Sequence, residues 1–178
     1  SQLDVDRLDY LSRDSFYTGV REGFIGSERL LSMLDLQDEN LVMQEKGIYS
    51  IENFLMARRL MYWQVYLHKT AISAETMLIQ ILRRAKDLIN QGHKLSCSKA
   101  LMLFLKKEYT WEEFKADANL LIAFTDLDDH DVWAAIKTWK DADDKILSLL
   151  CTHFLSRRLF TCKLGSQPLP KSKRTEIA

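Results

Sequence analysis

The chain has 178 residues, of which 47% are hydrophobic and 28% charged, values that are ordinary for a globular protein with a substantial core. Its 25 basic and 25 acidic side chains cancel to a formal net charge of zero. This balance argues against general nucleic-acid binding, although a few cationic side chains suffice for one nucleotide. The apolar runs are too short to cross a membrane and no signal-peptide pattern opens the chain, so we expect no membrane partner.

Few residues in the chain break helices. There are six glycines and two prolines, and both prolines lie near the C-terminal end. The composition therefore predicts an all-α fold of six or seven helices with minor short strands. We expect a single helical domain over residues 1–164 and an exposed, charged tail over residues 165–178. The three cysteines have no metal-type spacing, so we expect reduced thiols in a cytoplasmic protein.

The first part of the chain alternates between helical patterns and glycine-containing turns. Leu8 and Leu11 can face a core from the first helix. Ser27 and Ser50 are the expected N-caps of two later helices. The predicted elements are a helix over 3–14, a short helix over 27–34, a short strand over 41–46 and a long helix over 51–68.

The second part of the chain is predicted to be helical almost throughout. Gly92 is a suitable C-cap residue, and Thr110 with Glu113 forms a capping-box pattern. Val132, Trp133 and Ile136 are expected to point inward. One predicted helix covers 73–90, and a second begins at 96 or 98 and ends at 107. Two further helices begin at 110 and at 128 or 129, and the last runs from 141 or 143 to 158. A strand is predicted over 159–164.

The first predicted helix carries an unusual polar face. Asp6, Tyr10 and Asp14 are spaced i, i+4 and i+8, so they share one side of the helix. A carboxylate at the start of this face can bind a metal, and the tyrosine and second carboxylate can meet a bound substrate. Spacing alone equally fits a helix whose polar face is simply solvated.

A second polar stripe lies on the long helix. Arg58, Tyr62, Tyr66 and Lys69 fall on one side of it. Because Tyr and Arg are common where a helix is half buried, an interfacial stripe is the alternative interpretation.

Together the two stripes resemble a known family. Residues 3–20 contain every fixed position of the pattern D-x-D-[RK]-x-D-Y-x-x-R-D-x-x-x-x-G. This pattern resembles the last metal-ligand helix of the HD-domain phosphohydrolases, in their dNTP triphosphohydrolase-like branch. The motif formed by Arg58 and Tyr66-x-His68-Lys69 is similar to the next long helix of that family. The specific resemblance covers roughly residues 2–69.

The resemblance implies an HD-domain-like helical bundle that uses a divalent metal, which is Mn, Fe, Mg, Zn or Ni in such proteins. Asp6 is implied to be the last carboxylate of a His/His/Asp/Asp site, and is therefore both the catalytic residue and the metal ligand that we expect. Its partner ligands are expected upstream, because the only His-Asp pair of this chain is His130-Asp131. The chain is then a C-terminal-side portion of a longer polypeptide, and by itself we expect it to be inactive and to bind metal weakly.

The resemblance also implies how a substrate is held. Arg7 and Arg58 are implied to bind phosphates, with Lys69 a weaker candidate, since arginine matches phosphate oxygens with a planar fork. Asp14 and Tyr10 are implied to contact the sugar end. The implied substrate-binding residues are Arg7, Tyr10, Asp14, Arg58, Tyr66 and Lys69, with Tyr66 against the sugar or base, where its size disfavours a 2′-hydroxyl.

The implied activity is hydrolysis of a deoxynucleoside triphosphate to deoxynucleoside and triphosphate, by attack of water on the α-phosphorus. Two alternatives stay open on the sequence. One is a non-catalytic helical module for interaction or oligomerisation. The other is an HD phosphohydrolase that acts on monophosphates or other phosphate esters, because a fold by itself does not fix the substrate. A homo-oligomer is expected in each case.

Overall fold

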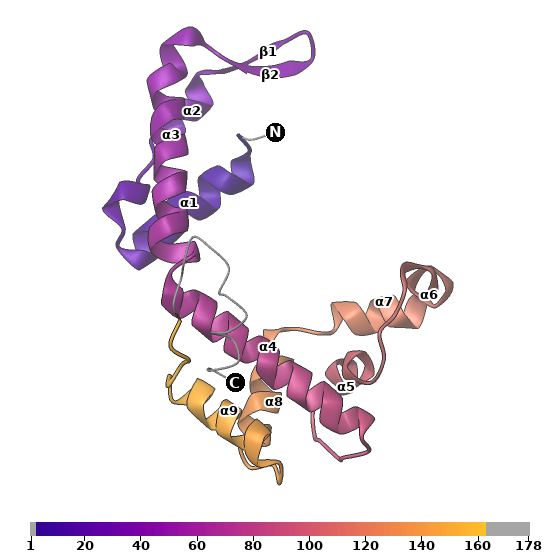
Figure 1. Ribbon diagram of the computed structural model, residues 1–178. Coiled ribbons are helices and arrows are strands. Elements are labelled where there is room, and N and C mark those ends of the chain that lie inside the picture. Colours follow the sequence, from indigo (N-terminus) through magenta and orange to yellow (C-terminus); the bar gives the residue numbers. More distant parts are fainter. Residues whose placement is uncertain (1–2, 163–178) are drawn as a thin grey trace, which may run out of the picture. The chain divides into compact units, whose positions relative to one another are not determined.

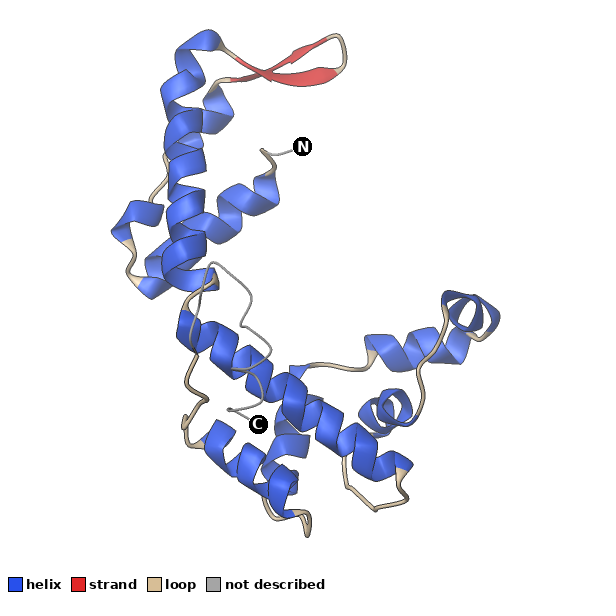
Figure 2. Cartoon of the chain, in the orientation of Figure 1, coloured by secondary structure: helices blue, strands red, loops and turns tan. Residues whose placement is uncertain are grey.

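The computed structural model describes residues 3–162, and the backbone contacts divide the chain into two compact units, Ser1–Ala71 and Ile72–Ala178. Nine α-helices, a π-helical turn and a single two-stranded hairpin lie in the described part (Figures 1 and 2). The all-α prediction is confirmed, but six or seven helices was too few, and the helix over Ala118–Thr125 was not predicted separately from the one that starts near residue 110. The expected single domain stays a prediction, and the expected tail lies outside the described residues.

The first unit begins with the polar helix. The carboxylate of Asp4 accepts a hydrogen bond from the Arg7 backbone N–H at 2.8 Å and so caps helix α1. Gly19, with φ 72°, ends α1 one turn later than predicted. The elements of this unit are α1 (Val5–Thr18), η1 (Arg21–Gly23), α2 (Ser27–Ser32), β1 (Leu34–Gln37), β2 (Asn40–Met43), η2 (Glu45–Gly47), α3 (Ile48–Met61) and the π-helical turn η3 (Tyr62–Tyr66).

Both serines that were expected to cap helices in this unit lie inside them instead. Ser27 is the first residue of α2, whose N-cap is Gly26. Helix α3 already begins at Ile48, after the N-cap Gly47, so Ser50 lies in its first turn. The 3-10 turn η2 leads directly into α3 and supplies helical backbone there, so the helix starts without a side-chain cap.

The strand predicted over 41–46 is confirmed only up to Met43, because the 3-10 turn η2 begins at Glu45, and the hairpin adds a partner strand that was not predicted. Strands β1 and β2 pair antiparallel from Leu34↔Met43 to Gln37↔Asn40. Asp38 and Glu39 form the two-residue turn, with φ 49° and 61°. Hairpin turns with two positive φ angles favour Asn-Gly or Asp-Gly. The Asp-Glu sequence lacks this signal, which is why the first strand was missed.

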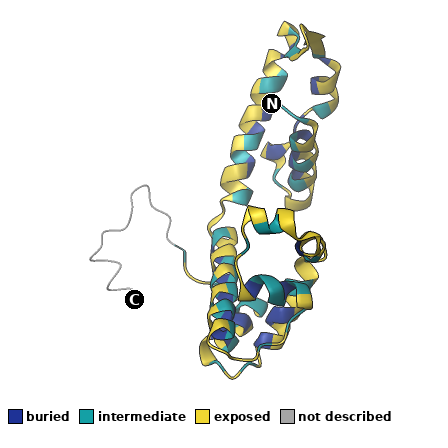
Figure 3. Ribbon diagram, turned by 90° about the vertical axis from the view of Figure 1, so that its right-hand side faces the viewer, coloured by how far each residue is buried: buried dark blue, intermediate teal, exposed yellow. Residues whose placement is uncertain are grey.

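The core of the first unit forms between α1 and α3. Leu8 and Leu11 are buried as predicted, and they pack with Phe54 and Met61. Gly23 of η1 lies so close to Met61 that an added Cβ would be 2.5 Å from its Sδ. Figure 3 shows buried and exposed positions alternating around the long helices. This packing fixes how the polar residues of α1 and α3 face each other.

Most helices of the second unit lie where they were predicted, but the helix over Ala118–Thr125 was not. Ser98 and Asp128 are the N-caps of α5 and α8, and Thr110 with Glu113 forms a complete capping box at α6. The last helix is capped by Asp144 rather than by Asp141 or Asp143. The elements are α4 (Lys69–Asn90), α5 (Lys99–Lys106), α6 (Trp111–Ala116), α7 (Ala118–Thr125), α8 (Asp129–Trp139) and α9 (Lys145–Leu155). The strand expected over 159–164 is not formed at 159–162, and its last two residues lie outside the described part.

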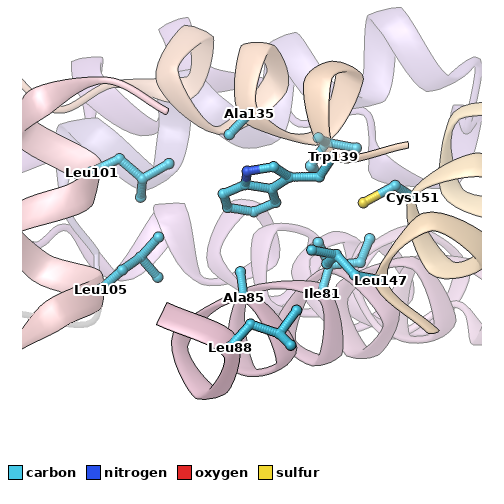
Figure 4. Packing of buried hydrophobic residues seen from close by; sticks show 10 residues of the cluster. Ile81, Ala85, Leu88, Leu101, Leu105, Ala135, Trp139, Leu147 and Cys151 are labelled. Atoms are coloured by element: carbon cyan, nitrogen blue, oxygen red, sulfur yellow. The ribbon is translucent and has the colours of Figure 1, made fainter. Parts of the chain in front are cut away.

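Trp139 is the centre of the second core (Figure 4). Its ring is buried among side chains of α4, α5, α8 and α9, and its Nε1 donates a hydrogen bond to the Ser96 carbonyl at 2.9 Å. Trp133 was expected to point inward but is 47% exposed, because α8 turns Val132, Ile136 and Trp139 toward the core instead. Cys151 lies in the same core, and its burial raises the pKa of its thiol to about 12.

None of the helices in residues 3–162 combines the length and the apolar character needed to cross a membrane. The three cysteines carry free thiols, in agreement with the sequence.

Gly23→Ala tests the packing between η1 and α3. The new methyl group has to displace the buried Met61 side chain, so we expect a loss of about 1–3 kcal/mol in the free energy of unfolding. Chemical denaturation measures this. Gly26→Ala is the matched control, because a Cβ there meets nothing within 4 Å, and its cost should stay below about 1 kcal/mol. Equal losses in the two variants would contradict the packing.

Asp144→Asn tests the ion pair that joins α4 to α9. Arg84 donates to both carboxylate oxygens of Asp144, at 3.1 and 2.6 Å, and lowers the pKa of Asp144 to about 2. Because the folded pKa lies below the ordinary value of 3.8, the pair stabilises the fold above that value and is lost as pH falls toward 2.

The asparagine still accepts the hydrogen bond from the Leu147 N–H but has no charge, so we expect the free energy of unfolding to fall by about 1 kcal/mol at neutral pH. Denaturation curves at neutral and acid pH should show this difference shrinking below pH 3.8. Asp141→Asn is the control, since its carboxylate is exposed and 3.8 Å from Lys140. A difference independent of pH would rule out the charge as its cause.

Candidate functional site

The two polar motifs meet through a hydrogen bond between side chains 52 residues apart. The Tyr66 hydroxyl donates to Oδ2 of Asp14 at 2.6 Å. Tyr10, one turn before Asp14 on α1, lies edge-on to the Tyr66 ring, with their centroids 6.1 Å apart. Three of the residues singled out in the sequence therefore form one cluster on the first unit.

A π-helical turn brings Tyr66 to this position. Helix α3 ends at Met61, and the next turn widens so that the Leu67 N–H donates to the Tyr62 carbonyl, five residues earlier, at 2.8 Å. Such widened turns occur frequently at functional sites. The regular helix predicted through His68 is therefore wrong at its end. The widened turn changes the direction of Tyr66 relative to Arg58 compared with a regular helix.

Arg58 joins the cluster through aromatic rings. Its guanidinium carbon lies 5.2 Å from the centroid of the Tyr62 ring, and Tyr62 packs edge-on to Tyr66 at 5.1 Å. The Tyr10 phenol beside the guanidinium raises the pKa of Arg58 above its already high ordinary value. Within residues 3–162 Arg58 forms no ion pair, and its Nε is shielded from solvent without a hydrogen-bond partner. A full positive charge is thus held here without a neutralising carboxylate.

The Tyr66 phenol is held in its protonated form. Burial raises the pKa of Tyr66 well above its ordinary value, and the hydrogen bond to the Asp14 carboxylate raises it further. The single O–H of Tyr66 is donated to Asp14, so the cluster offers a ligand the carboxylate of Asp14 as an acceptor and the guanidinium of Arg58 as a cationic donor. This set of groups can bind a ligand that carries both hydroxyl groups and anionic oxygens.

The other three predicted site residues are less closely joined. Asp6 is exposed on α1, one turn before Tyr10. Arg7 is half-buried and pairs with Asp4, with 3.3 Å between Nε and Oδ2. Lys69 is exposed and begins α4. The structure thus unites Tyr10, Asp14, Arg58 and Tyr66, while the expected positions of Asp6, Arg7 and Lys69 at a ligand stay predictions.

The described residues do not supply a metal centre. No group of three or more His, Cys, Asp or Glu side chains in residues 3–162 could hold a metal ion. Asp6 provides a single exposed carboxylate, which by itself does not fit the predicted His/His/Asp/Asp site. Its role as a metal ligand requires further ligands from outside these residues.

Tyr62 is the residue of this cluster that sequence reasoning placed on the stripe but did not assign to the site. The spacing of four residues from Arg58 to Tyr62 and again to Tyr66 was a usable signal. The π-helical turn had no such signal in the sequence.

Comparisons with known proteins agree with the motifs. Residues 25–96 match the family model described as the HD associated region. A crystal structure of a phosphohydrolase from Bacteroides thetaiotaomicron has 52% sequence identity and a TM-score of 0.93, and the match covers 98% of this chain and 43% of that one. The YwfO protein of Bacillus subtilis is 36% identical over 162 residues, which are 90% of this chain and 35% of the relative.

A further relative matches about half of the chain. A Dictyostelium discoideum protein, a homolog of the deoxynucleoside triphosphate triphosphohydrolase SAMHD1, is 30% identical over 95 residues, 53% of this chain and 18% of that protein. Together these similarities support the HD superfamily for this chain. The chain spans about 35–43% of the length of its Bacillus and Bacteroides relatives, so the activity of a whole protein is a matter for proposal.

A double-mutant cycle tests whether the hydrogen bond between Tyr66 and Asp14 links the two motifs. Tyr66→Phe and Asp14→Ala should each destabilise the fold, and the coupling energy should be about 1–2 kcal/mol, because the acceptor is charged and both side chains are half-buried. Chemical denaturation of the four proteins measures it. The control cycle uses the exposed pair Asp9 and Arg13, for which about 0.3–0.5 kcal/mol is expected. Coupling no larger than that of the control would mean that the bond does not link the motifs.

Proposed function

We propose that this chain provides the substrate-binding helices of an HD-domain phosphohydrolase that hydrolyses deoxynucleoside triphosphates to deoxynucleoside and triphosphate. The observation that carries the proposal is the cluster in which Tyr66 donates to Asp14 beside Tyr10 and Arg58. Residues from two separate motifs gather there; Tyr10 and Tyr66 also pack against the core of the first unit, whereas Asp14 and Arg58 are not part of that core. A solvated surface has no requirement for such a set.

Each member of the cluster has a role that suits its chemistry. Arg58 binds a phosphate oxygen, since its charge has no carboxylate partner in the described part of the chain. Asp14 accepts a hydrogen bond from the 3′-hydroxyl of the sugar, with Tyr10 beside it. Tyr66 packs against the sugar and disfavours a 2′-hydroxyl by its size. Arg7 and Lys69 add positive charge toward the phosphates.

The proposal places the catalytic metal mainly outside this chain. Asp6 contributes one carboxylate, and the remaining ligands belong to other parts of the polypeptide, which agrees with the relatives being more than twice as long as the matched region. The names of the SAMHD1 homolog and of the Bacteroides phosphohydrolase support this class of reaction. We further propose that the functional form is a homo-oligomer.

The experiment is a nucleotide panel on the full-length polypeptide that contains this sequence. The four dNTPs, the four NTPs and the nucleoside monophosphates are incubated with manganese, and the products are separated by ion-exchange chromatography. We expect triphosphate from one or more dNTPs and little from the NTPs. Orthophosphate from monophosphates would replace the proposed substrate class, and no turnover with several divalent metals would favour the non-catalytic module.

Arg58→Lys tests the role of the cluster in that reaction. Lysine keeps the charge but loses the planar fork, so kcat/KM for the preferred dNTP should fall about tenfold to a hundredfold. Arg59→Lys is the matched control, because Arg59 is the exposed next residue of α3. If both variants retained full kcat/KM, Arg58 would not be a phosphate-binding residue.

A further inference from the structure

Tyr62 links Arg58 to the hydrogen-bonded pair of Tyr66 and Asp14. Its ring lies 5.2 Å from the Arg58 guanidinium carbon and 5.1 Å from the Tyr66 ring centroid. Tyr66 in turn donates to Asp14. Tyr62 is 39% exposed, so one part of its ring packs in the cluster while another part faces outward.

The contact with the Tyr62 ring holds the Arg58 guanidinium without a carboxylate. Other arginines of this chain are held by carboxylates, as Arg84 is by Asp144 and Arg13 by Asp9. A carboxylate occupies guanidinium donors and competes with an anionic ligand. An aromatic face attracts the cation without adding a carboxylate charge, and although the Tyr10 and Tyr62 phenols also interact with the guanidinium, neither neutralises it.

The contact with Tyr62 also limits the directions in which the Arg58 side chain can point. Arg58 lies in the last turn of α3, and Tyr62 is the first residue of the π-helical turn. The Tyr62 carbonyl accepts a hydrogen bond from the Leu67 N–H. A long arginine side chain on a helix surface otherwise samples many rotamers, and fixing it costs conformational entropy on binding. The ring of Tyr62 restricts these rotamers before a ligand arrives.

We propose that Tyr62 is a positioning residue, whose ring holds the Arg58 guanidinium in place for a phosphate group of the bound nucleotide. The inference rests on the proposed function, because it takes the phosphate as the ligand of Arg58. Tyr62 acts through Arg58 and does not itself bind the phosphate. Its effect is therefore on substrate affinity rather than on the chemical step.

The test compares two substitutions in the full-length polypeptide. Tyr62→Phe keeps the ring and removes the hydroxyl, whereas Tyr62→Leu removes the ring and keeps an apolar side chain. For the preferred dNTP we expect KM to rise about tenfold in Tyr62→Leu with kcat within about twofold, and both constants to stay within about twofold in Tyr62→Phe. Trp63→Leu is the matched control, because Trp63 is the next residue of the same turn and is 71% exposed.

A second readout separates positioning from a general structural effect. In an Arg58→Ala background, Tyr62→Leu should no longer raise KM, since the side chain that it positions is gone. Circular dichroism checks the fold of each variant, and Tyr62→Met serves as a second ringless variant if Tyr62→Leu does not fold.

The outcomes are distinct. If the wild type releases triphosphate from dNTPs but Tyr62→Leu keeps the wild-type KM, or raises KM equally in the Arg58→Ala background, the role of Tyr62 is wrong and the proposed function stands. If Tyr62→Phe loses as much affinity as Tyr62→Leu, the hydroxyl and not the ring is responsible, which also overturns the inference. If the wild type releases no triphosphate, the proposed function fails and takes the inference with it.

Discussion

The packing of α1 against α3 is the constraint on which the candidate site depends. Leu11 and Met61 are fully buried between these helices, and Gly23 closes the space beside Met61 because no side chain fits there. Since the helices are fixed by their apolar sides, their polar sides are fixed as well. Asp14 and Tyr66 can then meet at 2.6 Å although they are 52 residues apart. A small shift between the helices would break this contact.

Two arginines of the chain are held in different electrostatic surroundings. In the second unit, Arg84 is neutralised by Asp144, which also caps α9, so charge serves stability there. In the first unit, Arg58 is held by phenol rings and keeps its charge unpaired within residues 3–162. A cation held by aromatic rings is not neutralised by a carboxylate.

Local signals in the sequence were strong enough to predict most of the second unit. Ser98, Thr110 and Asp128 cap helices as expected, because capping depends on the few residues around a helix start. The capping signals did not identify the first residue of a helix correctly where several neighbouring residues could serve as the N-cap. Ser50 lies within the first turn of α3, and Asp144 rather than Asp143 caps α9. Trp133 was placed inward by its apolar character, although the direction of the α8 face leaves it half exposed.

The sequence by itself determined the helical class, the buried side of α1, and the candidate residues of both motifs, because these follow from composition and from spacing along one helix. Only the tertiary structure decided which candidates come together. It joined Tyr10, Asp14, Arg58 and Tyr66, left Asp6 and Lys69 exposed, and brought Tyr62 into the cluster through a π-helical turn. The reason is physical, since contacts between α1 and the end of α3 depend on the packing of distant segments and on one widened turn, and neither leaves a periodic pattern in the sequence.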